Sequence, residues 1–573
     1  KHSRTDLRDG TAMRHSVMVA MALAASADGA PKLPHIVMHL ADDFGWANAG
    51  WHRPEGFNEV QTPVMDGLVK SGIELDRAYS YQFCSPTRSA LQSGRLPTHV
   101  NTKNLGTGVW NPADPVSGFS GIPRNMTGMA TVMKRAGYAT HQAGKWDAGM
   151  ATPDHTPFGR GYMTSLNYFC HANDYWDEMC GGGLVDLWDT THPGFGENGS
   201  CLAYYNGSHG CHQPGGNPGY TTGPEELYEE HKLVTRVLET IEAHDPETPL
   251  FFNYDSHIVH SPLQVPQPYF DKFSFIQNAS TPDWDYHRHL YTSMVNYLDT
   301  GVGKIVEALK TKGMWENTIW VFQSDNGGPS FTGDNHTANN FPLRGAKYSN
   351  WEGGIRVNAF VSGGYLAKVA PARIGTKLEG LVSIADWYAT FAAIAGQDPT
   401  DHRAAAAGLP PIDGVDQWPY LTGKAAASPR TDIFADHAVL IKGNFKVMQG
   451  SAESTGNPTC PKGPGNPDGS LACVKAACWA GPYYPNASVP NPACAYTEFC
   501  AKGACLYNIF EDPEERNNLS DDPQHQSVLS EMLQALAAYQ AGEFQPNRTG
   551  GNPQLAASVG HTKYRGFWGP FLP

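Results

Sequence analysis

Cys84 is the residue whose chemistry most needs an explanation. The 573-residue chain has 11 cysteines, and all except Cys84 fall into two even groups. Pro86 suits the first turn of a helix with its interior at 87–92, which places residue 84 at the positive end of the helix dipole. Anions bind well at such a position. The pattern therefore predicts a special group at an anion-binding helix start, and the alternative is a free buried cysteine before a surface helix.

Three apolar runs predict buried strands, and polar groups follow each of them. The runs cover residues 35–40, 248–254 and 317–323. The polar groups are, in chain order, Asp42, Asp43, His257, His260, Asp325 and Asn326. Because functional groups collect beyond the carboxyl ends of strands in an open α/β sheet, we expect these loops to face one pocket. The alternative is that the Asp and Asn residues only shape loops or cap helices.

Helical patterns lie between the predicted strands. Apolar residues recur at spacings of three and four over 227–243 and 291–310. Strands that alternate with helices predict an α/β fold with a large, mostly parallel mixed sheet flanked by helices. A smaller C-terminal α+β domain should follow, with a short antiparallel sheet and a helix. Its predicted elements are a hairpin of 435–440 and 445–448, a strand at 506–510 and a helix at 526–541.

The predicted domain organisation has three parts. Residues 1–33 form a signal peptide or N-terminal tail, because a basic start, a short apolar run and small residues follow Met13. Residues 34–430 form the main domain, with a Cys-rich loop insertion at 160–225. Residues 431–573 form the C-terminal subdomain, with a Cys-rich loop at 451–505. Disulfides within each cysteine group leave the connectivity open, and zinc is the alternative for the second group.

Composition limits the compartment and the partners. Sequons for N-glycosylation are dense, at Asn125, Asn198, Asn206, Asn278, Asn335, Asn486, Asn518 and Asn547. Together with the even cysteine groups, they predict a secreted or lysosomal glycoprotein made in the secretory pathway. The net charge of −15 and the lack of a basic cluster argue against a nucleic-acid partner. No run after the N-terminal segment is apolar for long enough to span a bilayer.

The segment Cys84-Ser-Pro86-Thr-Arg88-Ser-Ala-Leu91-Gln-Ser-Gly94-Arg95 resembles the signature of the sulfatase family. This family comprises the formylglycine-dependent type I sulfatases of the alkaline phosphatase superfamily. The resemblance extends roughly over 34–519, and arylsulfatase B-like members are the most similar. It implies a catalytic sulfatase domain over 34–430, in which a formylglycine-generating enzyme oxidises Cys84 to formylglycine.

The resemblance also implies a metal site. Asp42 and Asp43 are similar to the family's first two metal ligands, and Asp325 and Asn326 are similar to its last two. Residue 84 would complete the site. Oxygen donors without histidine suit a hard cation, so we expect one calcium ion per chain.

Three further segments resemble family motifs around the sulfate. Lys145 lies in Gly-Lys-Trp, His260 in His-Ser-Pro and Lys347 in Arg-Gly-Ala-Lys. The resemblance implies that these three residues hold the sulfate oxygens, with Lys347 or His260 as proton donor, while Arg88 acidifies the nucleophile.

One position departs from the family pattern. The family usually has histidine after Gly-Lys-Trp, where this chain has Asp147. An aspartate can accept the same proton, but it adds negative charge beside a departing anion. We therefore expect Asp147 to be the base for sulfate release, or His141 or His155 to compensate for the missing histidine.

These matches predict a sulfuric ester hydrolase of the arylsulfatase type. Its substrates would be aryl sulfates in vitro and a sulfated carbohydrate in nature, cleaved through a hydrated formylglycine and a covalent sulfo-enzyme. One alternative is a phosphoesterase or phosphodiesterase of the same superfamily. The two lysines and the ligand set for a single metal favour a sulfatase over this alternative. The other is a non-catalytic glycan-binding homologue, which would not require an intact Cys84 or four metal ligands.

Overall fold

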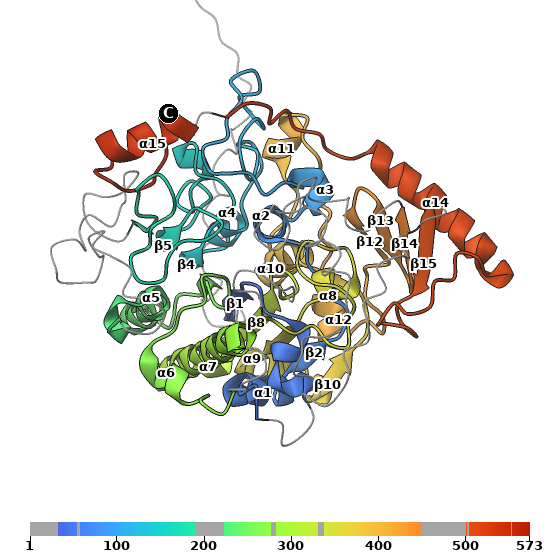
Figure 1. The fold of residues 1–573 in the computed structure, drawn as a ribbon, viewed down its shortest axis with the longest axis horizontal. Helices are drawn as coiled ribbons and strands as arrows, with labels where there is room; N and C mark the ends of the chain where they lie inside the picture. The colour runs from blue at the N-terminus through green and yellow to red at the C-terminus, as the bar shows by residue number, and fades with distance from the viewer. Residues whose placement is uncertain are drawn as a thin grey trace, which may run out of the picture. The chain divides into compact units, whose positions relative to one another are not determined.

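The centre of the fold is a nine-stranded mixed sheet, with strand order β10-β2-β9-β8-β1-β7-β4-β5-β6 (Figure 1). The computed structural model describes residues 32–53, 58–190, 223–276, 282–329, 337–449, 500, 503–551 and 553–573. Of the predicted segments, nearly all of 1–33 lies outside the described residues, as do 191–222 of the insertion and 451–499, 501 and 502 of the Cys-rich loop. Residues from Pro34 to Pro573 form one compact unit, and the boundary at residue 430 stays a prediction.

The three predicted strands are neighbours in the middle of the sheet. β1 (His35–Ala41) pairs in parallel with β7 (Leu250–Asp255) on one side and with β8 (Thr318–Ser324) on the other. β7 also pairs in parallel with β4 (Ala139–Lys145). Every residue of β1, β7 and β8 is buried, as expected for strands covered on both faces. Their carboxyl ends therefore lie side by side at one edge of the sheet.

Short strands extend the sheet on both sides. Beyond β8 lie β9 (Ala359–Ser362), β2 (Ile73–Leu75) and β10 (Thr376–Leu378), and β9 runs antiparallel to both of its neighbours. Beyond β4 lie β5 (Thr164–Tyr168) and β6 (Trp188–Asp189). The prediction that 160–225 is only a loop insertion is thus wrong for these two strands. Ser165 bonds Asn167 on β5, and this polar content removed the apolar pattern that marks a strand.

Helices cover the sheet in two groups. α5 (Glu229–Ala243) and α1 (Pro63–Lys70) both contact the long helix α7 (Pro282–Thr311). α2 (Cys84–Ser93), α4 (Met129–Arg135) and α10 (Asp386–Ile394) contact one another, and Figure 1 shows them across the sheet from α7. Periodicity explains α5, whose buried Leu233, Val237 and Ile241 recur every four residues. The α/β prediction is confirmed.

The predicted small sheet is also present, with corrected strand ends. β12 (Asp432–Asp436), β13 (Val439–Lys442), β14 (Phe445–Gln449) and β15 (Ala504–Asn508) form an antiparallel sheet in that order. The predicted strand at 435–440 is split by a turn at 437–438, so the hairpin partners are β13 and β14. α14 (Gln526–Ala541) has the predicted bounds and packs on β13 and β14 (Figure 1).

Two disulfides lie within the described residues, Cys170–Cys180 and Cys500–Cys505. Each joins members of one predicted group, and the second excludes those two cysteines from a zinc site. The other predicted pairs fall outside the described residues, at Cys201, Cys211, Cys460, Cys473, Cys478 and Cys494.

Surface features of the predicted export pathway are only partly described. Of the sequon asparagines, Asn518 and Asn547 are exposed and Asn125 is partly exposed. The others lie outside the described residues, at Asn198, Asn206, Asn278, Asn335 and Asn486. None of the helices in the described part of the chain combines the length and apolar character needed to cross a bilayer.

Candidate active site

The predicted oxygen donors meet where β1 and β8 end. Asp42 and Asp43 follow β1, and Asp325 and Asn326 follow β8. The Asp43 backbone N–H donates to Asp325 Oδ1 over 3.1 Å, and Asn326 Nδ2 donates to Asp43 Oδ1 over 2.7 Å. All four side chains are fully buried. The parallel register of two neighbouring strands therefore brings together residues that lie almost 300 positions apart in the sequence.

Cys84 is the first residue of α2 and faces this cluster. Its thiol lies 3.5 Å from Asp42 Oδ1 and 3.6 Å from Asn326 Oδ1. It is buried and is a free cysteine among the described residues. Burial, reinforced by the charges of Asp325 and Asp42, raises the pKa of the Cys84 thiol well above its usual range. The thiol is therefore held protonated, which makes it a poor nucleophile.

Three cations surround the carboxylates. Arg88, one helical turn after Cys84, donates through Nη2 to Asp325 Oδ2 over 2.9 Å. Lys145, the last residue of β4, donates to Asp42 Oδ2 over 2.6 Å. Lys347 lies 2.7 Å from Asp43 Oδ1. Burial alone would lower the pKa values of both lysines, but the facing aspartates outweigh it and the net shifts are upward.

The residues present fit a hard cation. Ligand atoms of Asp42, Asp43, Cys84 and His260 all lie within 4.8 Å of one another, and Asp325 contacts the same group. Four buried carboxylate or amide side chains at two strand ends match the oxygen ligands that calcium takes. The same carboxylates bond to lysine or arginine, so each of these buried negative charges has a cationic partner.

His260 lies at the edge of the same cluster. Its Nε2 is 3.7 Å from Asp43 Oδ2, while its Nδ1 lies 2.6 Å from the Ser261 carbonyl. A carbonyl only accepts, so Nδ1 carries a proton and, in the neutral ring, Nε2 is an acceptor. Burial lowers the pKa of His260 well below its usual range, and the nearby lysines reinforce this shift. The ring is therefore held neutral.

Asp147 lies beside the cluster rather than within the oxygen set. Its Oδ1 accepts from the Ser85 hydroxyl over 2.5 Å and lies 2.9 Å from His171 Nδ1. Its Oδ2 is buried without a hydrogen-bond partner, 3.9 Å from Lys145 Nζ. The backbone φ of Asp147 is 45°, a left-handed conformation that Asp, Asn and His adopt more readily than other side chains.

The structure corrects the prediction about a compensating histidine. His141 bonds Thr164 and stacks on Phe252, and His155 bonds Thr152, so neither contacts Asp147. The histidine that does so is His171, which sequence reasoning missed. It directly follows Cys170, within the loop closed by the Cys170–Cys180 disulfide, and no spacing rule links it to residue 147.

Asp255 is a second residue that the sequence reasoning missed. It ends β7, and its Oδ1 lies 3.9 Å from Arg88 Nη1. Burial raises the pKa of Asp255 to about 7. Its position was available to the same rule that predicted Asp42, because it directly follows a predicted strand.

Taken as chemistry, this edge of the sheet offers an oxygen-lined cation site, a residue at a helix start and two lysines. Such a site at the carboxyl ends of parallel strands suits the binding and hydrolysis of anionic esters. A family model described as Sulfatase matches residues 34–397. The chain belongs to the sulfatase family and is a sulfuric ester hydrolase.

Known relatives agree along most of the chain. Arylsulfatase J of Mus musculus is 27% identical over 570 residues, which cover 94% of this chain and 80% of that protein. Arylsulfatase A of Bos taurus is 28% identical over 560 residues, covering 94% and 93%. The crystal structure of Ps i-CgsB in complex with k-i-k-neocarrahexaose has a TM-score of 0.64 at 23% identity, covering 90% of this chain and 94% of that one. This last likeness is one of fold.

Proposed function

We propose that Cys84 is converted to formylglycine and that its hydrate is the nucleophile for sulfate esters. One observation carries the proposal: Cys84 begins α2 with its thiol 3.5 and 3.6 Å from Asp42 Oδ1 and Asn326 Oδ1. A buried thiol that faces carboxylates is protonated and weak, whereas an aldehyde hydrate at this position has a hydroxyl to attack with. A formylglycine-generating enzyme would therefore act on the chain during its maturation.

We propose calcium as the metal, held by Asp42, Asp43, Asp325, Asn326 and residue 84. The donor set supports it, since carboxylate and amide oxygens are hard ligands. When bound, the ion would acidify a hydroxyl of residue 84 and offset the charge of the sulfate.

The surrounding side chains divide the remaining work. Lys145 and Lys347 would hold the sulfate oxygens, because each presents a buried ammonium beside residue 84. Lys347 is the better proton donor for the leaving alcohol, since His260 Nε2 is an acceptor in the neutral ring and suits an orienting role. Arg88 would hold Asp325 and favour ionisation at residue 84.

Asp147 is the proposed base for sulfate release. Its Oδ2 accepts no hydrogen bond from the described residues and lies 3.9 Å from Lys145 Nζ. Lys145 also bonds Asp42, and Asp42 in turn contacts Cys84. During release, a hydroxyl of residue 84 gives its proton to this oxygen and its electron pair forms the aldehyde C=O bond. The C–O bond to the sulfate breaks, and sulfate leaves with the electron pair of that C–O bond.

The proposed natural substrate is a sulfated carbohydrate. Support comes from solved relatives in fold, one of which was crystallised with k-i-k-neocarrahexaose and another with its substrate D-glucosamine-2-N,6-O-disulfate. Relatives in sequence include N-acetylgalactosamine-6-sulfatase of Homo sapiens, which is 27% identical. A secreted or lysosomal location accords with this substrate and with the sequons.

Two measurements test the proposal. Mass spectrometry of the peptide that spans residue 84 should show the aldehyde, and an unmodified thiol in fully active enzyme would refute the nucleophile. Initial rates on nitrophenyl sulfate should exceed those on nitrophenyl phosphate. Faster phosphate cleavage would favour a phosphoesterase of the same superfamily. If the chain hydrolysed neither ester and no sulfated glycan, a glycan-binding protein would be favoured.

A further inference from the structure

We infer that His171 is a positioning residue for Asp147, and that the two together replace the single histidine expected after Gly-Lys-Trp. This inference rests on the proposed function. His171 Nδ1 lies 2.9 Å from Asp147 Oδ1, and the Ser85 hydroxyl donates to the same oxygen over 2.5 Å. Two donors on Oδ1 fix the rotation of the carboxylate. The other oxygen, Oδ2, is left free beside Lys145.

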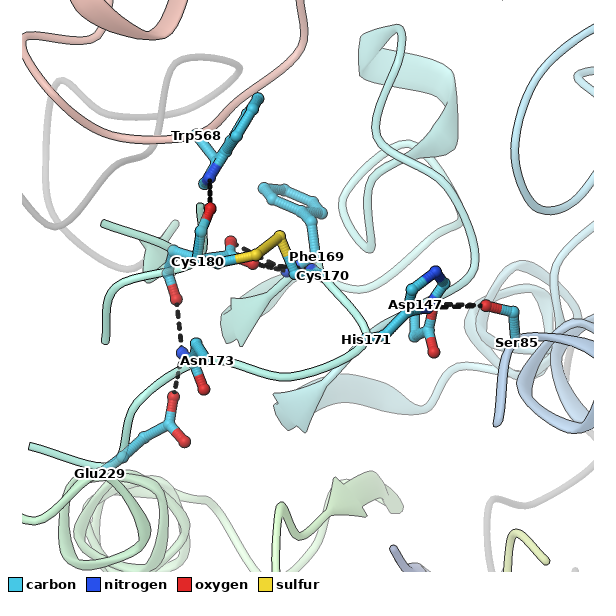
Figure 2. The surroundings of a disulfide bond; sticks show 10 residues. Ser85, Asp147, Phe169, Cys170, His171, Asn173, Cys180, Glu229 and Trp568 are labelled. Carbon is cyan, nitrogen blue, oxygen red and sulfur yellow. Dashed lines mark hydrogen bonds and ion pairs between the residues drawn. A yellow bond between two sulfur atoms is a disulfide. The ribbon is translucent and has the colours of Figure 1, made fainter. Parts of the chain in front are cut away.

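A short rigid segment holds His171 in place (Figure 2). The disulfide joins the preceding residue, Cys170, to Cys180. The Asp186 carboxylate accepts from the Phe169 and Cys170 backbone N–H groups over 2.9 and 2.7 Å. Downstream, Asn173 Nδ2 donates to Glu229 over 2.7 Å. The backbone on both sides of His171 is therefore anchored independently of Asp147.

Asp147 needs such a partner because it is deeply buried. Its side chain is 4% exposed, whereas that of His171 is 30% exposed. Burial raises the pKa of Asp147, but His171 and Lys145 lower it by more, so the net shift is downward and the carboxylate stays ionised. Without the imidazole N–H, only the Ser85 hydroxyl would hold Oδ1, and the carboxylate would repel the departing sulfate more strongly.

The proton in the release step moves only to Asp147 Oδ2. The O–H bond of residue 84 breaks, the C=O bond forms, and the C–O bond to sulfate breaks with its electrons on the sulfate. His171 touches none of these atoms in this assignment. It donates one hydrogen bond to Oδ1 throughout the step, so its removal should act through Asp147 alone.

The test compares His171→Ala, His171→Asn, Asp147→Ala and the double variant of the calcium-loaded, formylglycine-bearing enzyme. His171→Ala should slow turnover by about 10- to 100-fold, the effect of losing a hydrogen bond to a charged group. Mass spectrometry of quenched reactions should show sulfated enzyme accumulating. His171→Asn should restore turnover to within about threefold, since its amide N–H reaches the same oxygen. In the Asp147→Ala background, His171→Ala should add no further loss.

His141→Ala is the matched control, because it removes a histidine of similar burial that does not contact Asp147. Turnover and accumulation should match the unsubstituted enzyme. Equal losses in His171→Ala and His171→Asn, or losses that multiply in the double variant, would overturn the inference. So would unchanged release in His171→Ala.

A second readout does not depend on turnover. Calorimetry would measure inorganic sulfate binding to calcium-loaded chain in which Cys84 is left unmodified. Asp147→Ala should bind sulfate more tightly than the unsubstituted chain, because a carboxylate is removed. His171→Ala should bind sulfate more weakly, because the Asp147 carboxylate loses the imidazole that offsets its charge. Shifts of the same sign would overturn the inference. If the unsubstituted enzyme carried no formylglycine and turned over no sulfate ester, the proposed function itself would be refuted. Failure of the His171 inference and failure of the proposed function therefore give different results.

Discussion

Two groups of buried carboxylates lie near the ends of the central strands, and they differ in most of the groups that neutralise them. The first group, here called the catalytic cluster after the role proposed for it, contains Asp42, Asp43 and Asp325, each bonded to a lysine or an arginine. The second group, here called the acid cluster, contains Glu178, Asp186, Glu229 and Glu230. Three of its members accept hydrogen bonds from neutral groups: Glu229 from Asn173, Glu230 from Tyr254 and the His257 N–H, and Asp186 from the Phe169 and Cys170 N–H groups. The fourth, Glu178, pairs with Lys232.

The difference decides what each cluster binds. Burial raises the pKa values of Glu178, Glu229 and Glu230 to about 8, so the acid cluster takes up protons at neutral pH. In the catalytic cluster, burial raises the pKa of Asp325 to only about 6, because Arg88 and the lysines oppose it. The cations beside Asp325 therefore favour its ionised form, whereas the neutral donors at Glu229 and Glu230 do not offset the effect of burial, which favours the protonated form.

Removing one catalytic carboxylate should have the largest effect. Asp325→Ala deletes an oxygen ligand and leaves Arg88 without its closest acid. We expect calcium to fall from near one ion per chain to background, by elemental analysis after dialysis, and sulfatase activity to fall by about 10³-fold or more.

Glu229→Gln in the acid cluster is the control for this change. It should keep both calcium content and activity near the values of the unsubstituted enzyme. Glu229 has a pKa of about 8, so at neutral pH it is mostly protonated and does not attract a cation. Calcium loss in both variants would break the comparison between the clusters. Tight zinc binding without calcium would contradict the metal assignment.

A third buried group lies between these extremes and tests the role of the cation. Lys446 Nζ lies 3.0 Å from Glu352 Oε1 and 2.5 Å from Glu515 Oε1, and all three side chains are fully buried. Burial raises the pKa of Glu515 to about 7 despite this lysine. Lys446→Met should lower the free energy of unfolding by about 3 kcal/mol at pH 7.5, the cost of removing one partner from a buried ion pair.

Urea unfolding at two pH values would sharpen this result. The loss should shrink at pH 5, where protonation of a glutamate replaces the missing lysine. Lys442→Met on the neighbouring strand is the control, because Lys442 pairs with Glu531 at the surface and should leave the midpoint unchanged. A loss that is equal at both pH values would assign the effect to packing instead.

The sequence predicted that the carboxylates of the catalytic cluster lie close together, because two simple rules locate them. Asp42 and Asp325 each follow an apolar run, and parallel strands put their ends together. Pro86 lies in the first turn of α2, as predicted, and the helix begins at Cys84. The family motif then linked Lys145 and Lys347 to the same point. Local sequence signals and long-range geometry agree here.

The remaining contacts had no such signal. His171 reaches Asp147 through a loop after β5, a polar strand that was mistaken for an insertion. The acid cluster depends on the N-terminus of α5 packing against the segment after β7, where Glu229 meets His257. Residue spacing within one helix or strand cannot reveal which loops of different elements contact each other. Nor does it reveal burial, which alone turns a glutamate from a charged surface group into a protonated core group.

The smallest expected effect is a change in the pH dependence of stability, controlled by the acid cluster. The folded pKa of Glu229 is about 8, and an unfolded glutamate titrates near about 4.3. Between these values the folded chain holds a proton that the unfolded chain has lost, so stability must fall as pH rises. Glu229→Gln carries the equivalent of that proton at every pH, and its amide can still donate to His257. With EDTA present to remove the metal, the loss of unfolding free energy between pH 5.5 and 7.5 should be smaller in Glu229→Gln, by up to about 1.4 kcal/mol per pH unit. Glu239→Gln, an exposed position on the same helix, should keep the original slope. Equal slopes in the two variants would mean that Glu229 is ionised in the folded chain, and the contrast between the two clusters would then be lost.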